Sequence, residues 1–240
     1  MRPIRLASLP LLIAACGAIA CAKSAPRIDA SAAAAPLSPP PAGLDLDRFE
    51  SEIAGFEASD RAAPPAPGGI VFVGSSSIRR WETLAADFPG LPVLNRGFGG
   101  STLPEAVHYA RRIVLPYRPR LVVLYAGDND IPMGRTPTQV AGDYRAFVSV
   151  VRSALPTARI VFVSVKPAPS RWAYQSSVRE TNRLVRAITA ADPLQSFVDV
   201  FTPMLGSDGR PRADLYVSDS LHMTPQGYAI WRRQLAPVVQ

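Results

Sequence analysis

Cysteine, histidine and long apolar runs are all scarce in this chain. Only two of the 240 residues are cysteines, Cys16 and Cys21, and both lie near the N-terminus. The rest of the chain therefore folds without a disulfide bond. The two histidines, His108 and His222, are far apart in the sequence, so no cluster of histidine and cysteine has the spacing of a metal site. We expect no metal ion and no other cofactor.

A concentrated basic region is also missing. Lysine and arginine together number 26 against 19 acidic residues, which gives a formal net charge of +7. The arginines are scattered, and the sequence has no lysine-rich run and no basic patch interleaved with aromatic residues. This pattern indicates a solvated surface with a mild attraction for anions. It does not have the features of a nucleic-acid interface, so we expect no nucleic-acid partner.

The N-terminus has the pattern of a targeting segment. Two arginines precede an apolar run over residues 6–15, which at about ten residues is too short to span a bilayer as a helix. The run ends in Ile-Ala-Ala-Cys-Gly, with the cysteine at position 16. This sequence resembles a bacterial lipobox, which implies that residues 1–15 are a signal peptide and that Cys16 is lipidated. Cys21 is a second candidate, and an ordinary secretory signal is the alternative.

The lipobox resemblance implies a location and a domain layout. The protein is expected in the bacterial cell envelope, held to the membrane by the lipid anchor alone and facing the periplasm. Gly17 favours the outer membrane because it is not the aspartate that retains lipoproteins in the inner membrane. A secreted protein is expected if the signal is not a lipobox. Residues 16–43 are rich in Ala, Pro and Ser and form a tether, so residues 44–240 form the folded domain.

Within that domain, short apolar runs alternate with helical patterns. An amphipathic helix is expected over 46–58, followed by a break at 63–69. The strands predicted after it are 70–73, 92–94, 121–125, 160–165 and 197–200. The helices predicted between and after them are 77–86, 103–114, 138–154, 176–190 and 225–237. This alternation predicts an α/β fold with three layers, α/β/α, around a parallel sheet of about five strands.

The first three strands are each followed by polar or glycine-rich residues. Ligands of such folds bind at the carboxyl ends of the strands. The first strand breaks at Gly74 and is followed by serines 75–77, a strand–turn–helix pattern that can expose a serine hydroxyl. The glycine-rich loop 95–101 follows the second strand, and Gly-Asp-Asn-Asp at 127–130 follows the third. Each segment alone is equally consistent with a structural turn.

A candidate base lies before the last helix. His222 follows Asp219 by three residues, so the carboxylate can hold one ring nitrogen while the other faces a hydroxyl. A plain Asp–His pair at the start of a helix is the alternative. His108 lies within a predicted helix with no acidic residue in a favourable place nearby in the sequence, and we expect an ordinary surface or half-buried role for it.

These segments together resemble a known superfamily. The blocks are Gly-x-Ser after the first strand, Gly-Gly-Ser-Thr after the second, Gly-x-Asn-Asp after the third and Asp-x-x-His before the last helix. In this order they resemble the SGNH hydrolases (GDSL-type esterases and lipases), whose domain has a flavodoxin-like fold, over residues 68–240. One residue departs from the pattern, because Ser75 stands where the family has an aspartate.

The resemblance assigns roles by position. Ser76 matches the nucleophile, His222 the base and Asp219 the residue that orients it. The oxyanion hole is formed by the backbone of Ser76, by Gly100 and by Asn129. The neighbouring serines 75 and 77 make the choice of nucleophile depend on this alignment. Gly100 is preferred over the other glycines of its loop because it directly precedes Ser-Thr.

The predicted function is hydrolysis of carboxylic esters, either acyl or O-acetyl. Substrates are expected to be small esters, lipids or acylated glycans. Short loops around the expected crevice favour a small acyl or acetyl group, and Trp172 and Tyr174 are expected at its rim, either stacking on a substrate or pinning their loop. A second hypothesis, motivated by Ser75 and the basic surface, is an inactive scaffold that binds envelope glycan. A third is a structural lipoprotein. The sequence does not predict the oligomeric state.

Overall fold

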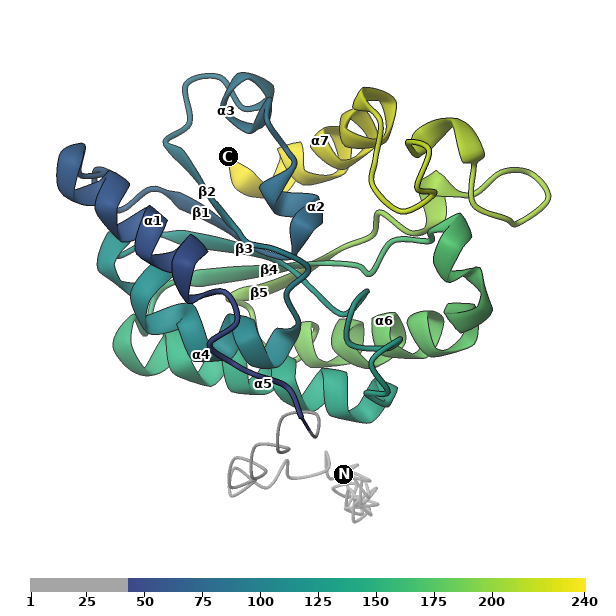
Figure 1. Cartoon of the computed structure of the whole chain (residues 1–240), viewed down its shortest axis with the longest axis horizontal. Helices are drawn as coiled ribbons and strands as arrows, with labels where there is room; N and C mark the ends of the chain where they lie inside the picture. The colour runs from purple at the N-terminus through teal and green to yellow at the C-terminus, as the bar shows by residue number, and fades with distance from the viewer. Residues whose placement is uncertain (1–42) are drawn as a thin grey trace, which may run out of the picture. The chain divides into compact units, whose positions relative to one another are not determined.

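A parallel sheet of five strands lies at the centre of the protein. The computed structural model describes residues 43–240, and the strand order is β2-β1-β3-β4-β5 (Figure 1). The strands are β1 (Ile70–Gly74), β2 (Val93–Gly97), β3 (Leu121–Tyr125), β4 (Arg159–Val163) and β5 (Gln195–Val198). The predicted fold, a parallel sheet inside α/β/α layers, is therefore confirmed.

Helices cover both faces of this sheet. Helices α4, α5 and α6 lie on one face, and α2, α3 and α7 lie on the other (Figure 1). Helix α1 packs on α4 at the outside of the first layer. The bounds are α1 (Glu50–Ala62), α2 (Ser76–Arg79), α3 (Leu84–Asp87), α4 (Leu103–Ile113), α5 (Pro137–Ala154), α6 (Gln175–Thr189) and α7 (Pro225–Val239), with 3-10 turns η1 (Leu115–Tyr117), η2 (Pro169–Tyr174), η3 (Thr202–Met204) and η4 (Ala213–Leu215).

Alternate strand residues feed two separate apolar cores. Val71 and Val73 of β1 join the core beneath α4 and α5, whereas Ile70 and Phe72 join the core beneath α2 and α7. Successive side chains of a strand point to opposite faces, so a strand covered on both faces must be apolar throughout. Every residue of β1 and β3 is buried accordingly. Packing on both faces therefore holds these two strands, and with them the loops that follow their carboxyl ends, in place.

The helix predicted over 46–58 lies four residues later, as α1, and two further elements differ in extent from the prediction. The expected helix over 77–86 is two short helices, α2 and α3, separated by a turn. The turn lets Trp81 enter the second core, where only 1% of its surface is exposed, and the indole Nε1 donates to Asp87 Oδ2 over 2.6 Å. Strand β2 also runs through Asn95 to Gly97, which were expected in a loop, because the backbone pairs in register with β1 as far as Gly74↔Gly97.

Two further observations bear on the predicted location. No helix within residues 43–240 is long and apolar enough to cross a membrane. The predicted signal peptide, the lipidation candidates Cys16 and Cys21, and nearly all of the tether lie outside the described residues. They stay predictions of the sequence.

Candidate active site

The turn between β1 and α2 leaves Ser76 as the accessible member of three serines. Gly74 has φ +135, and a Cβ atom there would lie 1.8 Å from the carbonyl oxygen of Tyr125, so only glycine fits between β1 and β3. Ser75 and Ser77 are buried at 0% and 1% exposure, whereas Ser76, the first residue of α2, is partly exposed. Of the three hydroxyls that the sequence left as candidates, that of Ser76 is therefore the accessible one.

Three side chains form a hydrogen-bonded chain at this point. The hydroxyl Oγ of Ser76 lies 2.9 Å from Nε2 of His222. The other ring nitrogen, Nδ1, lies 2.6 Å from Oδ2 of Asp219. Ser76 and His222 are 146 residues apart in the sequence, so only the folded sheet brings them together. This is the arrangement in which an imidazole can take a proton from a serine hydroxyl.

The carboxylate of Asp219 is held by its own loop. Its Oδ1 accepts hydrogen bonds from the backbone N–H groups of Leu221 and His222, both over 2.9 Å. Partial burial alone would raise the pKa of Asp219, but the hydrogen bonds from the His222 side chain and from these two N–H groups outweigh it and hold the pKa well below its usual range. Asp219 therefore stays ionised, with one oxygen fixed and the other aimed at the ring.

The predicted oxyanion residues Gly100 and Asn129 lie beside each other. A Cβ atom on Gly100 would come 3.8 Å from the side-chain Nδ2 of Asn129, and that Nδ2 donates to the carbonyl oxygen of Ser101 over 3.1 Å. Gly100 follows β2 and Asn129 follows β3, the two strands that flank β1. The carboxamide has two hydrogens, so one orients the group and the second is available to a ligand.

Asp130 ties these two loops together. Its Oδ1 accepts from the N–H of Leu103 at the start of α4 over 2.8 Å, and its Oδ2 accepts from the N–H of Gly127 over 2.9 Å. Burial raises the pKa of Asp130 to about 7, although the hydrogen bond from Leu103 acts in the opposite direction. The loop of Asn129 and the loop of Gly100 are thus joined through one buried side chain.

The sequence of this chain matches the profile of a known protein family. The sequence profile of the GDSL-like lipase/acylhydrolase family matches residues 58–230, well over half of the chain. The chain belongs to the GDSL-like lipase/acylhydrolase family. The superfamily resemblance inferred from the four sequence blocks is confirmed, and the five residues predicted for the triad and the oxyanion hole fall within the matched range.

Individual relatives agree with this membership. Subunit alpha1 of platelet-activating factor acetylhydrolase IB from Bos taurus is 33% identical over 171 residues, which cover 66% of this chain and 69% of the relative. The structure of a GDSL-like lipase from Bacteroides thetaiotaomicron matches with a TM-score of 0.68 at 20% identity, over 81% of this chain and 98% of the other. An acetylxylan esterase from Geobacillus stearothermophilus matches with a TM-score of 0.59 at 15% identity, over 72% and 95%. Both structures are similar in fold.

A buried charged network, which the sequence reasoning missed, lies beneath the serine turn. The ammonium of Lys166, with 0% of its side chain exposed, donates to Asp128 Oδ2 over 2.9 Å and to the hydroxyls of Ser77 and Tyr125 over 3.1 Å each. Ser75 donates to the other oxygen of Asp128 over 3.4 Å. Burial alone would raise the pKa of Asp128, but the Lys166 ammonium outweighs it and lowers that pKa.

This network gives Ser75 a structural context. Ser75 occupies the position where the family pattern has an aspartate, and the carboxylate next to it comes instead from Asp128, 53 residues later. The signal in the sequence was the unusual lysine directly after an apolar strand, because a lysine is almost never fully buried unless it is paired. Its partner could not be read from sequence spacing.

The remaining predicted residues lie at the rim or elsewhere. Trp172 of η2 packs against the first apolar core, with the Arg210 guanidinium 5.9 Å from its ring centre, so it pins its loop. Tyr174 is 39% exposed.

His108 lies on α4 and pairs with Asp47 over 3.0 Å. The sequence reasoning overlooked this acid because it lies 61 residues away. Between residues 43 and 240, no group of three or more His, Cys, Asp and Glu side chains is arranged to hold a metal ion.

Proposed function

We propose that this acylhydrolase is a serine esterase that hydrolyses carboxylic ester bonds through a covalent acyl-enzyme intermediate. The observation that carries the proposal is the hydrogen-bonded chain from Ser76 through His222 to Asp219, with separations of 2.9 and 2.6 Å. Membership of a lipase and acylhydrolase family supports the same reaction class.

The proposed reaction has two halves. In the first, Nε2 of His222 takes the proton of the Ser76 hydroxyl as Oγ attacks the ester carbonyl, and the same nitrogen then protonates the departing alcohol. In the second, His222 removes a proton from water, which attacks the acyl-serine and releases the acid. Asp219 stays ionised throughout, holding Nδ1 and stabilising the imidazolium that forms between the steps.

Negative charge develops on the carbonyl oxygen in both halves. The donors proposed for it are the backbone N–H groups of Ser76 and Gly100 and the free hydrogen of the Asn129 amide. Ser76 is the first residue of α2, so its N–H has no acceptor within the helix. Donors that are fixed before the reaction stabilise the oxyanion without reorganising, and each is worth about a hundredfold to a thousandfold in rate.

We further propose that the acyl group is small, with acetyl the first candidate. Two relatives support this choice by their names, an acetylhydrolase at 33% identity and an acetylxylan esterase with the same fold. The substrates named there differ, platelet-activating factor in one and acetylxylan in the other, so these names do not identify the alcohol portion.

The test is labelling and turnover with single-residue variants. Wild-type protein should react with a fluorophosphonate probe and hydrolyse 4-nitrophenyl acetate. Ser76→Ala should abolish labelling and lower kcat by about four orders of magnitude or more, as loss of the nucleophile does in other serine hydrolases. His222→Ala should lower kcat to a similar degree. Ser75→Ala should still be labelled, because its buried hydroxyl faces Asp128. Wild-type protein that neither labels nor turns over would contradict the proposal.

A further inference from the structure

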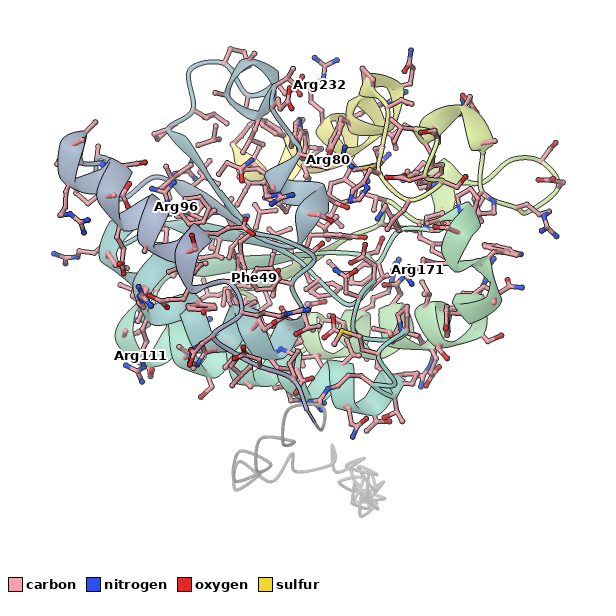
Figure 2. All side chains as sticks on the ribbon, in the orientation of Figure 1. Phe49, Arg80, Arg96, Arg111, Arg171 and Arg232 are labelled. Carbon is pink, nitrogen blue, oxygen red and sulfur yellow. The ribbon has the colours of Figure 1, made fainter. Side chains whose placement is uncertain are left out.

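Arg171 lies on the rim of the candidate site. It belongs to η2, the segment that follows β4, and Figure 2 shows its side chain on the inner side of that segment, toward the carboxyl ends of the strands. Its positive charge is also close enough to Asp128 to help lower the pKa of that carboxyl. Asp128 in turn contacts Ser75, the neighbour of the nucleophile candidate. Two independent observations thus place Arg171 at the site.

The guanidinium of Arg171 has no acceptor within the described chain. Its Nε atom is fully covered and makes no hydrogen bond. The other arginines of residues 43–240 that are buried or partly buried each donate to a carboxylate or to a backbone carbonyl; these are Arg96, Arg112, Arg135, Arg152 and Arg159. The Nε of Arg152 is also covered and unbonded, but its Nη1 donates to Asp192, so among these arginines of residues 43–240 Arg171 alone has no acceptor for its side chain.

The covered Nε–H of Arg171 lacks an acceptor, whereas its two Nη groups are not fully covered and stay open to a ligand. Covering a charged donor without an acceptor costs free energy, and a guanidinium presents a fork of N–H groups that matches carboxylate and phosphate. Asp128, whose pKa the Arg171 charge helps to lower, is already paired with Lys166, and Asp219 has Arg80 3.6 Å away, so neither carboxylate is reserved for Arg171. Arg171 thus places a positive charge without a hydrogen-bonded carboxylate at the rim of the site, where it attracts an anion.

The segment that carries Arg171 is joined to the loop of the proposed base. The N–H and the hydroxyl of Ser170 both donate to the carbonyl oxygen of Ser220, over 3.1 and 2.9 Å. Ser220 lies in the loop that carries His222, so η2 is pinned to the loop of the proposed base. In the proposed mechanism that base protonates the departing alcohol. The segment that carries Arg171 therefore adjoins the loop of the histidine that meets the alcohol in the proposed mechanism.

We propose that Arg171 is an anion-binding residue, and that the substrates of this acylhydrolase are esters whose alcohol portion carries a carboxylate or a phosphate group. The inference rests on the proposed esterase function for the site, but the anion site is defined by its own residues. The proposal specifies the alcohol portion of the substrate, which the names of the relatives do not identify.

The experiment compares matched acetyl esters. 4-Acetoxybenzoate carries a carboxylate on its alcohol portion, 4-acetoxyphenyl phosphate carries a phosphate, and 4-acetoxybenzamide is a neutral ester of similar size. The measured quantity is the ratio of kcat/KM for each anionic ester to that for the neutral one. Arg171→Gln should lower this ratio about tenfold to a hundredfold, the value of a charge-assisted hydrogen bond. Arg171→Lys should give an intermediate ratio. The larger of the two decreases identifies carboxylate or phosphate as the preferred group.

The matched control is Arg145→Gln, which removes the same charge from an exposed position on α5. Its ratio should equal that of the wild type. An equal ratio in Arg171→Gln and wild type would overturn the proposal, because a guanidinium that merely stabilises η2 would affect both esters alike.

A binding measurement separates this proposal from the esterase proposal. Calorimetric titration with the product analogues 4-hydroxybenzoate and 4-hydroxyphenyl phosphate needs no turnover. Both should bind the wild type and Arg145→Gln, and at least one should bind Arg171→Gln about tenfold more weakly or worse. If the protein hydrolyses no ester yet shows this binding difference, the esterase proposal fails and the anion site stands. If Arg171→Gln binds both analogues as tightly as the wild type, the anion site is wrong whatever the activity.

Discussion

At the scale of single residues, the proposed role of Asn129 as an oxyanion donor depends on the orientation of its side-chain amide. One hydrogen of its amide is used by the carbonyl oxygen of Ser101 over 3.1 Å, and this bond fixes the plane of the carboxamide. The second hydrogen has a fixed direction as a result. A donor that is oriented before the substrate arrives stabilises the transition state more than the ground state.

Asn129→Ala should therefore lower kcat about a hundredfold to a thousandfold with little change in KM, because the lost hydrogen bond strengthens only as the oxyanion forms. Steady-state kinetics with 4-nitrophenyl acetate measures both constants. A control measurement of the urea midpoint shows whether the fold is intact. A rise in KM with kcat unchanged would mean that Asn129 binds the ground state, contrary to the oxyanion role.

Some residues of the candidate site are predictable from short blocks of sequence, and others are not. Ser76, His222 and Asp219 were nominated because short blocks around them resemble those of a known superfamily, and the structure brings them within hydrogen-bond distance. Lys166 and Asp128 were not, because their pairing spans 38 residues and no local pattern connects them. The lack of an acceptor for Arg171 is likewise a property of the folded surroundings, so the sequence could not reveal it.

At the scale of elements, the link between the β3 loop and α4 passes through the buried Asp130. Its two oxygens accept from Leu103 and Gly127, and burial raises its pKa to about 7, against about 4 for an aspartate in an unfolded chain. A carboxyl with a raised folded-state pKa holds its proton more tightly in the folded protein. Its contribution to stability is therefore fully present below about pH 4 and is lost as the pH rises through about 7.

Asp130→Asn removes this titration, so the destabilisation it causes should depend on pH. Relative to the wild type, the loss in free energy of unfolding should be larger at pH 5 than at pH 8, by about 3 kcal/mol. Urea unfolding of both proteins at the two pH values measures it, and effects common to both proteins cancel in the difference. A loss that is equal at the two values, or larger at pH 8, would show that Asp130 is ionised in the folded protein across this range.

The elements themselves were largely predictable. Alternating apolar runs and helical patterns predict the parallel sheet, since strands covered on both faces must be apolar throughout. The break between α2 and α3 was missed because it depends on where Trp81 finds space, between Phe72 and Trp231 in the second core. The extension of β2 was missed because Asn95 and Gly97 favour turns locally, whereas pairing with β1 keeps them extended.

At the scale of the whole molecule, α1 and the residues before it brace the loop that carries Gly100. Glu52 accepts a hydrogen bond from the N–H of Gly99 over 3.1 Å. Arg48 donates to the carbonyl oxygen of Gly100 over 3.4 Å and to Glu105 over 3.0 Å. Phe49 lies against Gly99, where a Cβ atom would come within 1.9 Å of its ring. A helix outside the α/β core thus helps to set the position of a proposed oxyanion donor.

Glu52→Ala should lower kcat for 4-nitrophenyl acetate about tenfold, because small displacements of a positioned group are costly in catalysis. The matched control is Glu57→Ala, also on α1. The two glutamates are similarly exposed, at 33% and 34%, and each pairs with one arginine, but Glu57 pairs with Arg112, away from the loop. Its kcat should be close to that of the wild type. Equal decreases in both variants would mean that α1 acts only through overall stability.

This brace has a practical consequence for recombinant fragments. The family match begins at residue 58, in the middle of α1, so a fragment trimmed to that boundary would keep Ser76 and His222 and discard Arg48 and Glu52. Such a fragment would start inside a helix and leave the loop of Gly100 without its support. A weakly active preparation of that length would then reflect the choice of cloning boundary and would say little about the chemistry of the intact protein.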